Sequence, residues 1–324
     1  MRADPDTRWR LPEGRDRRLT PARADLADAA LDGRVAAGRY VSPAPRQVTA
    51  LLADLHPRPD AATQIDTQLL HGELVDLYEQ AEGWAWVRSR IDGYVGYLRA
   101  GNLGPPAEAT HRVAARAALA FAAPDIKAPA TRLPWPATVT VLETVPGAGT
   151  HGLLGRIVGG FVPMAHLVPV GTRAADWVAE AEALAGQPYL WGGRSGDGMD
   201  CSSLLQLALA TAGCAFPRDS DMQAAADLPG VTRLHAADLA ALRRGDLVFW
   251  AGHVGVMQDS ERLLHANAHH MAVASEPLAE TVARIEAKEG KGVTAVLRLD
   301  TRLMQQRLTL EPPLAERAIE KPSP

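Results

Sequence analysis

Apolar and polar residues alternate along the chain from Val48 onward. Runs such as LVDLYE, WAWVRSR and YVGYL place apolar side chains at every second position, and EGW and DGY separate the runs. This alternation is typical of strands with one buried face, and Gly-containing breaks are typical of turns. About five short strands within residues 48–104 predict a small antiparallel barrel.

Residues 105–170 repeat the pattern. TVTVLE and GLLGRIVGGFVPMAHL follow an opening strand and a Pro-marked loop. VGGFVPMAHL has the same order of strand, short turn and closing helical residues as DGYVGYLRAGNL. We therefore expect a tandem pair of barrels. Residues 1–47 are interpreted as an N-terminal arm that contains a short amphipathic piece, ADLADAALDGRVAAG.

The pattern changes after Val170. TRAADWVAEAEALAG has helical spacing and ends before Gly186 and Pro188. A polar, Gly-rich loop, SGDGMD, then leads into a helix with apolar residues at Leu204, Leu205, Ala208, Leu209 and Ala212. RRGDLVFWAGHVGVMQ, RLLHANA and VTAVLRLD predict strands of a sheet within residues 171–300, and residues 301–324 are interpreted as a polar, Pro-rich tail.

Composition narrows the class of protein. A mass of 34.6 kDa favours two or three domains. The net charge of -4 offers no electrostatic attraction to nucleic acid or anionic membranes, and no run approaches the roughly 20 apolar residues of a membrane span. We therefore expect neither nucleic acid nor membrane as a partner, and no pattern indicates an oligomeric state.

The N-terminal segment and the two cysteines indicate the cellular compartment of the protein. The first residues are charged and broken by proline, without the apolar core of a secretory signal. Cys201 and Cys214 are 13 residues apart in one predicted helix, which separates them by about 20 Å and prevents a disulfide. Free thiols and the lack of a signal predict a cytoplasmic protein.

Cys201 lies where the polar loop meets the apolar helix. A thiol attacks as its thiolate, and a helix N-terminus supplies partial positive charge that favours this form. A base is also needed. His253 and His265 occupy neighbouring strand-like runs, so a hairpin would place them side by side as base and orienting residue.

Other interpretations of these residues remain open. A cysteine at such a junction, taken alone, is more often a packed apolar residue, and Cys214 is assigned to that class. A lone strand histidine is usually structural. His265, His269 and His270 form a cluster, but no second ligand pair has zinc-like spacing, so we expect no metal and no cofactor.

Four linked motifs carry a resemblance: PYLWGGRSGDGMDCSSLLQ, PRDSDMQ, RRGDLVFW followed by HVGV, and LLHA. In order and spacing they resemble the NlpC family of bacterial cell-wall cysteine peptidases over residues 171–300. The resemblance implies an α+β, papain-like domain with the cysteine helix packed on an antiparallel sheet. The two segments before it resemble bacterial SH3-like barrels.

The resemblance also implies roles for individual residues. Cys201 would be the nucleophile, His253 the base, and His265 the residue that orients it. The hydroxyl of Tyr189 would help to stabilise the oxyanion, beside the backbone N–H of Cys201. The family usually has glycine where this chain has Ser203, a departure that bears on local packing and not on these roles.

The substrate that the family implies is a peptidoglycan-derived peptide, cut between γ-D-Glu and a diamino acid. The subgroup with SH3-like barrels acts on small muropeptides that have a free N-terminal L-Ala. Asp200 would read that amine, or serve only as a helix N-cap. Glu73 and Tyr94 match barrel residues that close this end of the cleft, but a solvated charge and a core aromatic are the alternatives. Ser202 and Ser220 match substrate-contacting serines.

Three other functions are compatible with parts of this pattern. The chain could remodel intact peptidoglycan, or serve as a non-enzymatic SH3-like binding module with a vestigial peptidase domain. It could also transfer acyl groups of lipids through the same thiol. The presence of Cys201, His253 and His265 argues against a vestigial domain, and YLWGG with GMDCS favours the peptidase.

Overall fold

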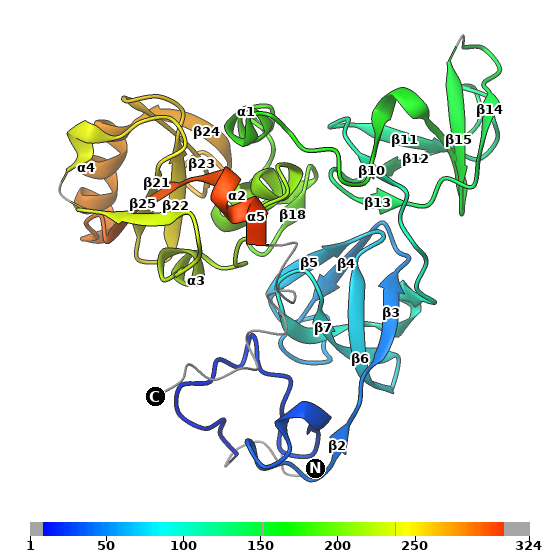
Figure 1. Ribbon diagram of the computed structural model, residues 1–324, viewed down its shortest axis with the longest axis horizontal. Coiled ribbons are helices and arrows are strands. Elements are labelled where there is room, and N and C mark those ends of the chain that lie inside the picture. Colours follow the sequence, from blue (N-terminus) through cyan, green and yellow to red (C-terminus); the bar gives the residue numbers. More distant parts are fainter. Residues whose placement is uncertain (1–8, 151, 237, 308–324) are drawn as a thin grey trace. The chain divides into compact units, whose positions relative to one another are not determined.

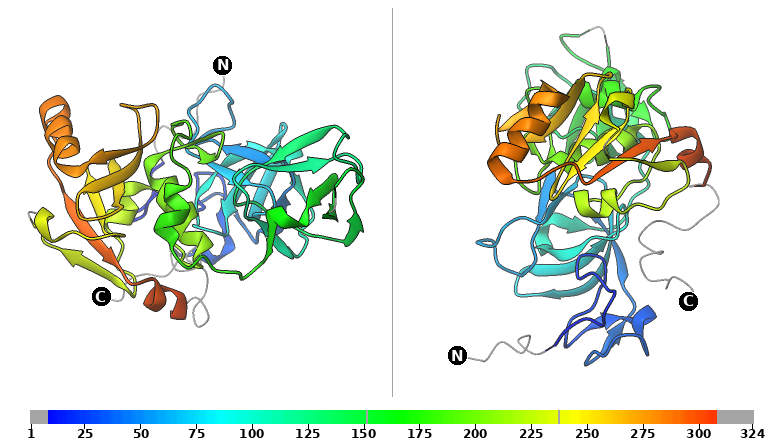
Figure 2. Two further views of the ribbon diagram at one scale, coloured as in Figure 1. Left: turned by 90° about the horizontal axis from the view of Figure 1, so that it is seen from above. Right: turned by 90° about the vertical axis from the view of Figure 1, so that its left-hand side faces the viewer.

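The computed structural model describes residues 9–150, 152–236 and 238–307 (Figures 1 and 2). Internal contacts divide the chain into two compact units, with the boundary between Glu108 and Ala109. Unit 1 holds the N-terminal segment and the first barrel. Unit 2 holds the second barrel and the predicted peptidase domain.

The first barrel consists of a five-stranded sheet in the order β8-β7-β6-β3-β9 and the hairpin β4-β5. Alternate side chains point into one apolar core, which explains the period of two in the sequence. The EGW turn joins β6 to β7 with positive φ at Glu82 (51°) and Gly83 (80°), as a two-residue hairpin turn requires. The strands are β3 (Ala44–Val48), β4 (Leu52–Leu55), β5 (Thr67–Leu70), β6 (Leu74–Ala81), β7 (Trp84–Ser89), β8 (Val95–Arg99) and β9 (Leu103–Gly104).

The segment predicted as an arm packs on this barrel. Leu26 is fully buried in a cluster with Tyr78, Trp86 and Val95, and the hydroxyl of Tyr78 donates to Asp28 at 2.6 Å. The amphipathic piece forms β1 (Ala27–Asp28), the short 3-10 helix η2 (Ala29–Leu31) and, further on, β2 (Tyr40–Val41). The part of the segment that the structure describes is therefore folded onto unit 1.

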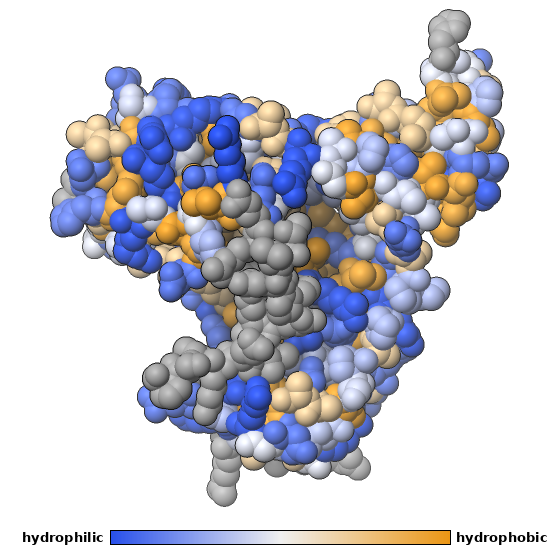
Figure 3. Space-filling model, in the orientation of Figure 1, coloured by the Kyte–Doolittle hydropathy of each residue, from blue (hydrophilic) through white to orange (hydrophobic). Residues whose placement is uncertain are grey.

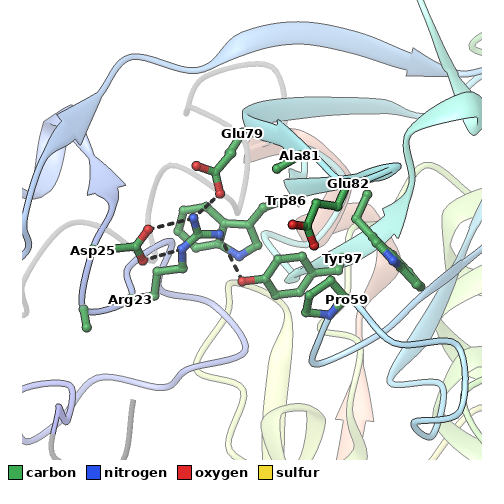
Figure 4. A pocket seen from close by; sticks show the side chains of 10 residues that line it. Arg23, Asp25, Pro59, Glu79, Ala81, Glu82, Trp86 and Tyr97 are labelled. Atoms are coloured by element: carbon green, nitrogen blue, oxygen red, sulfur yellow. Dashed lines mark hydrogen bonds and ion pairs between the residues drawn. The ribbon is translucent and has the colours of Figure 1, made fainter. Parts of the chain in front are cut away.

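A pocket of about 550 Å³ marks this junction (Figure 4). The Arg23 guanidinium lies 4.7 Å from the ring centre of Trp86 and donates to the hydroxyl of Tyr97 at 3.0 Å. Asp25 and Glu79 form ion pairs with the same group. Arg23 is therefore the cation that occupies this aromatic and acidic surface, and its cation–π contact and ion pairs hold the N-terminal segment on the barrel.

We predict that Leu26→Ala lowers the free energy of unfolding by about 2–5 kcal/mol, because it leaves a cavity between the segment and the barrel. Urea unfolding of the full chain, followed by tryptophan fluorescence, measures this. Ile91→Ala, at a side chain 43 % exposed, is the control. Equal, small losses for both variants would show that the segment does not stabilise the barrel.

The second barrel repeats the order of elements in the first. A hairpin, three strands in meander, a 3-10 helix and a closing strand follow one another, as β11-β12, β14-β15-β16, η4 and β17. The bounds are β10 (His111–Val113), β11 (Ala118–Phe121), β12 (Ala130–Leu133), β13 (Thr138–Val139), β14 (Glu143–Pro146), β15 (Leu153–Ile157), β16 (Gly160–Pro163), η4 (Met164–His166) and β17 (Leu167–Pro169). In the first barrel the 3-10 helix η3 (Ala100–Asn102) holds the equivalent place. The two predicted SH3-like barrels are both present.

Exposed apolar side chains gather on the second barrel, where Figure 3 shows hydrophobic patches over β14 and β15. They are Leu119, Ile126, Leu142, Leu153 and Val158.

The rest of unit 2 has mixed α and β structure. Six antiparallel strands form one sheet in the order β20-β25-β21-β22-β23-β24. Helix α2 packs against β22 and β23, and α4 covers the opposite face through Leu278 and Ile285 (Figure 1). The strands are β18 (Arg194–Ser195), β19 (Gly198–Met199), β20 (Val231–Leu234), β21 (Leu247–Trp250), β22 (His253–Met257), β23 (Arg262–Asn267), β24 (Ala272–Pro277) and β25 (Ala295–Leu299). The helices are α1 (Trp177–Glu182), α2 (Cys201–Thr211), α3 (Ser220–Ala224), η5 (Leu239–Ala241), α4 (Leu278–Glu289) and α5 (Thr301–Arg307).

Three boundaries differ from the sequence predictions. Helix α1 begins only at Trp177, because Asp176 caps it by accepting from two backbone N–H groups. Helix α2 ends at Thr211, so Cys214 lies beyond it rather than within it. The predicted tail begins as helix α5, with Met304 buried, and residues 308–324 lie outside the described part. No helix in the described ranges is long and apolar enough to cross a membrane.

Candidate functional site

Cys201 is the first residue of α2, and a capping box fixes it there. Asp200 accepts from the backbone N–H of Ser203 at 2.8 Å, and the Ser203 hydroxyl oxygen accepts from the Asp200 N–H at 3.1 Å. These reciprocal bonds satisfy amides that the first turn of a helix leaves without partners. The serine at the position of the family glycine therefore strengthens the start of the helix.

Asp200 is also the centre of a buried ion pair. Arg218 donates to its two carboxylate oxygens at 3.0 and 2.6 Å, Gly192 N–H donates at 3.1 Å, and the Ser202 hydroxyl donates at 3.2 Å. Burial opposes ionisation, but the charge and hydrogen bonds of Arg218 hold the pKa of Asp200 below its ordinary value. Asp200 is thus an ionised N-cap, and its contact with a substrate amine stays a prediction.

The Cys201 thiol is nearly buried, with 8 % of the residue exposed. Burial, reinforced by the negative charge of Asp200, raises its pKa to about 12, although the Val254 N–H and Arg218 act in the opposite direction. The helix N-terminus alone therefore does not produce a resting thiolate here, because burial of the thiol and the negative charge of the Asp200 N-cap outweigh it. The thiol must give up its proton to a base during the reaction.

His253, His265 and Glu276 form a hydrogen-bonded line across three neighbouring strands. The antiparallel registers of β22, β23 and β24 place each residue diagonally from the next on the same sheet face. His253 Nε2 lies 2.8 Å from His265 Nδ1, and His265 Nε2 lies 2.8 Å from Glu276 Oε1. The hairpin that brings the two histidines together is the one that the sequence predicted.

This line determines which ring nitrogens carry protons. The hydrogen bond from His265, helped by Arg284 and opposed by burial, lowers the pKa of Glu276 to about 2, so its carboxylate can only accept. His265 must then donate from Nε2 and accept at Nδ1, and His253 must donate from Nε2. Nδ1 of His253 is left with a lone pair.

His253 is neutral at neutral pH. Burial, together with electrostatic interactions with His265 and the Arg284 cation, lowers its pKa to about 3. The next residue, Val254, hydrogen-bonds to the Cys201 sulfur through its backbone N–H. Cys201 is therefore a neutral thiol on α2, and His253 is a neutral imidazole with a fixed tautomer on β22. These two elements pack against each other.

Glu276 is absent from the candidates that the sequence supplied. Arg284 of α4 donates to both of its carboxylate oxygens, at 2.7 and 2.9 Å, and His270 approaches it at 3.1 Å. His265 and His270 thus share a carboxylate partner. Among the residues that the structure describes, no group of three or more His, Cys, Asp or Glu could hold a metal ion.

We predict that Glu276→Gln lowers the kcat/KM of peptide hydrolysis by about 10-fold, since the amide still accepts from His265 but carries no charge to stabilise a cationic His253. Because the charge of Glu276 raises the His253 pKa, the acid limb of the kcat/KM profile should also move to lower pH. Glu280→Gln, at an exposed residue of α4, is the control. An unchanged profile would show that Glu276 is only structural.

Tyr189 is half-buried and held by its backbone N–H, which donates to Met271 O at 3.0 Å. Burial raises the pKa of its hydroxyl to about 12, and electrostatic interactions with Cys201 and with the Asp200 carboxylate add to the effect. The hydroxyl therefore stays protonated and can donate a hydrogen bond. Ser202 is buried beside Asp200, whereas Ser220 is half-buried at the start of α3.

Glu73 and Tyr94 belong to unit 1, whereas the site above is built from unit 2 alone. Tyr94 is 3 % exposed in the core of the first barrel, which matches the structural alternative considered for it. Glu73 accepts from the Leu70 N–H at 3.0 Å in the turn after β5. Their contacts with a substrate stay predictions.

Comparisons with known proteins identify two domains in the chain. Residues 186–291 match the NlpC/P60 family, and residues 55–103 match the bacterial dipeptidyl-peptidase Sh3 domain. The chain is 28 % identical over 239 residues to the gamma-D-glutamyl-L-lysine dipeptidyl-peptidase of Bacillus subtilis, covering 67 % of this chain and 77 % of that protein. It is 24 % identical over 247 residues to dipeptidyl-peptidase 6 of Lysinibacillus sphaericus, covering 68 % and 86 %.

Solved structures show the same fold. The crystal structure of an NlpC/P60 family protein from Bacillus cereus superimposes with a TM-score of 0.64 at 19 % identity, over 79 % of this chain and 99 % of that one. An NlpC/P60 endopeptidase from Photobacterium damselae gives a TM-score of 0.53 at 13 % identity, over 81 % and 74 %. Residues 186–291 therefore form an NlpC/P60 domain, and residues 55–103 form a bacterial SH3 domain ahead of it.

Proposed function

We propose that this protein is a cysteine peptidase that hydrolyses the amide between γ-D-Glu and the diamino acid of peptidoglycan stem peptides. The observation that carries the proposal is the hydrogen-bonded line from Glu276 through His265 to His253, since the residue after His253, Val254, hydrogen-bonds to the Cys201 sulfur at the start of α2. The name of the Bacillus subtilis relative, a gamma-D-glutamyl-L-lysine dipeptidyl-peptidase, supports the choice of bond.

The reaction begins with transfer of the Cys201 proton to Nδ1 of His253 as the sulfur attacks the γ-carbonyl carbon of D-Glu. The developing oxyanion accepts from the backbone N–H of Cys201 and the protonated Tyr189 hydroxyl. Glu276 and His265 stabilise the cationic His253 that forms.

Collapse of this intermediate breaks the C–N bond, and His253 gives its proton to the leaving amine. The acyl group stays on sulfur as a thioester. Water, deprotonated by His253, then attacks the thioester carbonyl, and breakage of the C–S bond releases the carboxylic acid product. The protonated His253 finally returns a proton to sulfur, which restores the thiol.

We further infer that small peptides with a free N-terminal L-Ala are the preferred substrates, and that the protein recycles muropeptides in the cytoplasm. The match of residues 55–103 to the bacterial dipeptidyl-peptidase Sh3 domain supports the first part. Asp200 is ionised next to the nucleophile, but Arg218 already pairs with its two carboxylate oxygens. The two free cysteines support the second, since reduced thiols are typical of that compartment.

The test uses synthetic L-Ala-γ-D-Glu-diaminopimelate with a free and with an acetylated amine, and mass spectrometry of the products. We expect L-Ala-D-Glu and diaminopimelate from the free peptide, and at least about 10-fold slower cleavage of the acetylated one, which loses its charge-assisted hydrogen bonds. Equal cleavage of the acetylated peptide and of intact sacculi would instead identify a wall-remodelling endopeptidase.

A further inference from the structure

A second pocket of unit 1 shares Arg23 with the pocket of Figure 4 but has the opposite charge. We call it the arginine pocket. It encloses about 660 Å³, within the roughly 300–1,000 Å³ of small-molecule sites. Its lining includes four guanidiniums, one carboxylate and an indole of the N-terminal segment: Arg10, Arg15, Arg17, Arg23, Asp16 and Trp9.

Three of these five charged groups have partners in the chain. Asp16 accepts from Arg18 through both carboxylate oxygens, at 2.6 and 3.1 Å, so this carboxylate is neutralised by a guanidinium that does not line the pocket. Arg23 has the ion pairs described above. Arg17 reaches Asp66 only at 3.4 Å, and its side chain is 60 % exposed, so solvent screens this pair and it stabilises little.

The other two cations, Arg10 and Arg15, have neither an ion pair nor a side-chain hydrogen bond among the residues that the structure describes. Arg10 is exposed, but Arg15 is half-buried. A guanidinium keeps its charge and all of its N–H donors at neutral pH, and burial takes away part of the water that would satisfy them. A bound anion would supply the acceptors that the chain does not.

The backbone that carries these two guanidiniums is fixed at both ends. The Trp9 indole N–H donates to the Ala36 carbonyl oxygen at 2.8 Å, and the Val95 N–H donates to the Arg18 carbonyl oxygen at 2.7 Å. Residues 12–15 form a turn between these points, closed by a backbone hydrogen bond of 3.2 Å. The segment is therefore ordered before a ligand arrives, which lowers the entropic cost of binding.

The two unpaired guanidiniums favour a phosphorylated ligand over a carboxylic acid. A carboxylate has two oxygens, and one guanidinium can bind both of them. A terminal phosphate group presents three oxygens and nearly two negative charges, so two guanidiniums can bind it together. The lining also has an apolar part, formed by Trp9, Leu11 and Val95 among others. A flat aromatic ring on the ligand would bury its faces there.

We propose that the arginine pocket binds a nucleotide, with Arg10 and Arg15 on the phosphate groups of a nucleoside di- or triphosphate and the base against the Trp9 indole. The arginines of this pocket lie within residues 10–23, ahead of both family matches, which begin at residues 55 and 186. The site therefore belongs to the N-terminal segment and its junction with the barrel. It does not depend on the proposed hydrolysis.

The test is isothermal titration calorimetry of the full chain with ADP, pyrophosphate and adenosine in magnesium-free buffer. We expect ADP to bind about 10-fold more tightly than pyrophosphate, because the base adds a stacking contact. Adenosine, which lacks the charge, should show no binding up to about 1 mM. Affinity for ADP should also fall as the salt concentration rises, since ions screen the arginines.

Arg10→Met and Arg15→Met should each weaken ADP binding by about 10-fold, the effect of one lost charge-assisted contact. Neither guanidinium has a partner to lose, so both variants should keep the wild-type midpoint of urea unfolding and the wild-type rate of tripeptide hydrolysis. Arg46→Met, which removes a cation of the same unit that lines neither this pocket nor that of Figure 4, should bind ADP within about 2-fold of wild type.

Three results would overturn the assignment. Wild-type protein that does not bind ADP would exclude the site. ADP binding that Arg10→Met and Arg15→Met both leave intact would place the nucleotide elsewhere on the chain. Equal affinities for ADP and pyrophosphate would show that the pocket does not bind the base. Each of these results leaves the proposed peptidase function unaffected, because that function is measured with the peptide alone.

Discussion

Replacing Cys201 with alanine should reduce hydrolysis of L-Ala-γ-D-Glu-diaminopimelate by about 10⁴-fold or more, because no other group can form the acyl intermediate. Release of free diaminopimelate, followed by chromatography, measures the loss. Circular dichroism should stay unchanged, since the capping box of α2 uses Asp200 and Ser203 and not the thiol.

Cys214→Ala is the matched control. Cys214 is also buried, and its thiol donates to the Thr301 carbonyl oxygen at 3.6 Å and hydrogen-bonds to Gln305. This variant should keep its kcat within about 2-fold of wild type, with a modest loss of stability from the small cavity. Wild-type turnover by Cys201→Ala would refute the nucleophile assignment.

Replacing His253 with alanine should lower kcat/KM by about 10³- to 10⁴-fold at pH 7. The reason is the thiol pKa of about 12, which leaves only about one thiolate in 10⁵ at pH 7 without a base. His235→Ala, at an exposed histidine of the same unit, should have no effect.

The pH dependence of His253→Ala separates a lost base from a misfolded site. The thiolate fraction rises tenfold per pH unit below the thiol pKa, so log kcat/KM of the variant should rise with a slope near 1 above about pH 7. The wild-type profile should stay flat there, because His253, with a pKa of about 3, is already neutral. A variant with wild-type activity and a flat profile would exclude His253 as the base.

Several features of the site were predictable from the sequence because they depend on local patterns. The loop-to-helix junction placed Cys201 at the start of α2. The strand runs around His253 and His265 implied a hairpin, and period-two geometry then put both rings on one face. The repeat of strand, turn and short helix likewise predicted the second barrel.

Other features depend on contacts that no local pattern reveals. Glu276 meets His265 only through the register of β23 with β24, and Arg284 reaches it from a helix that follows both strands. The protonation state of Cys201 was also beyond the sequence argument. A helix N-terminus favours a thiolate, but the acidic N-cap and the dry surroundings outweigh that effect.

The measurement that tests the central claim most directly is irreversible labelling with L-Ala-γ-D-Glu chloromethyl ketone, which places an electrophilic carbon beyond the γ-carbonyl. The account predicts one dipeptidyl adduct on the proteolytic fragment with Cys201, none on the fragment with Cys214, and loss of activity in proportion to labelling. It also predicts protection by the free tripeptide and slow labelling of His253→Ala. Full inactivation with the adduct on another residue, or full labelling of Cys201 with activity retained, would contradict it.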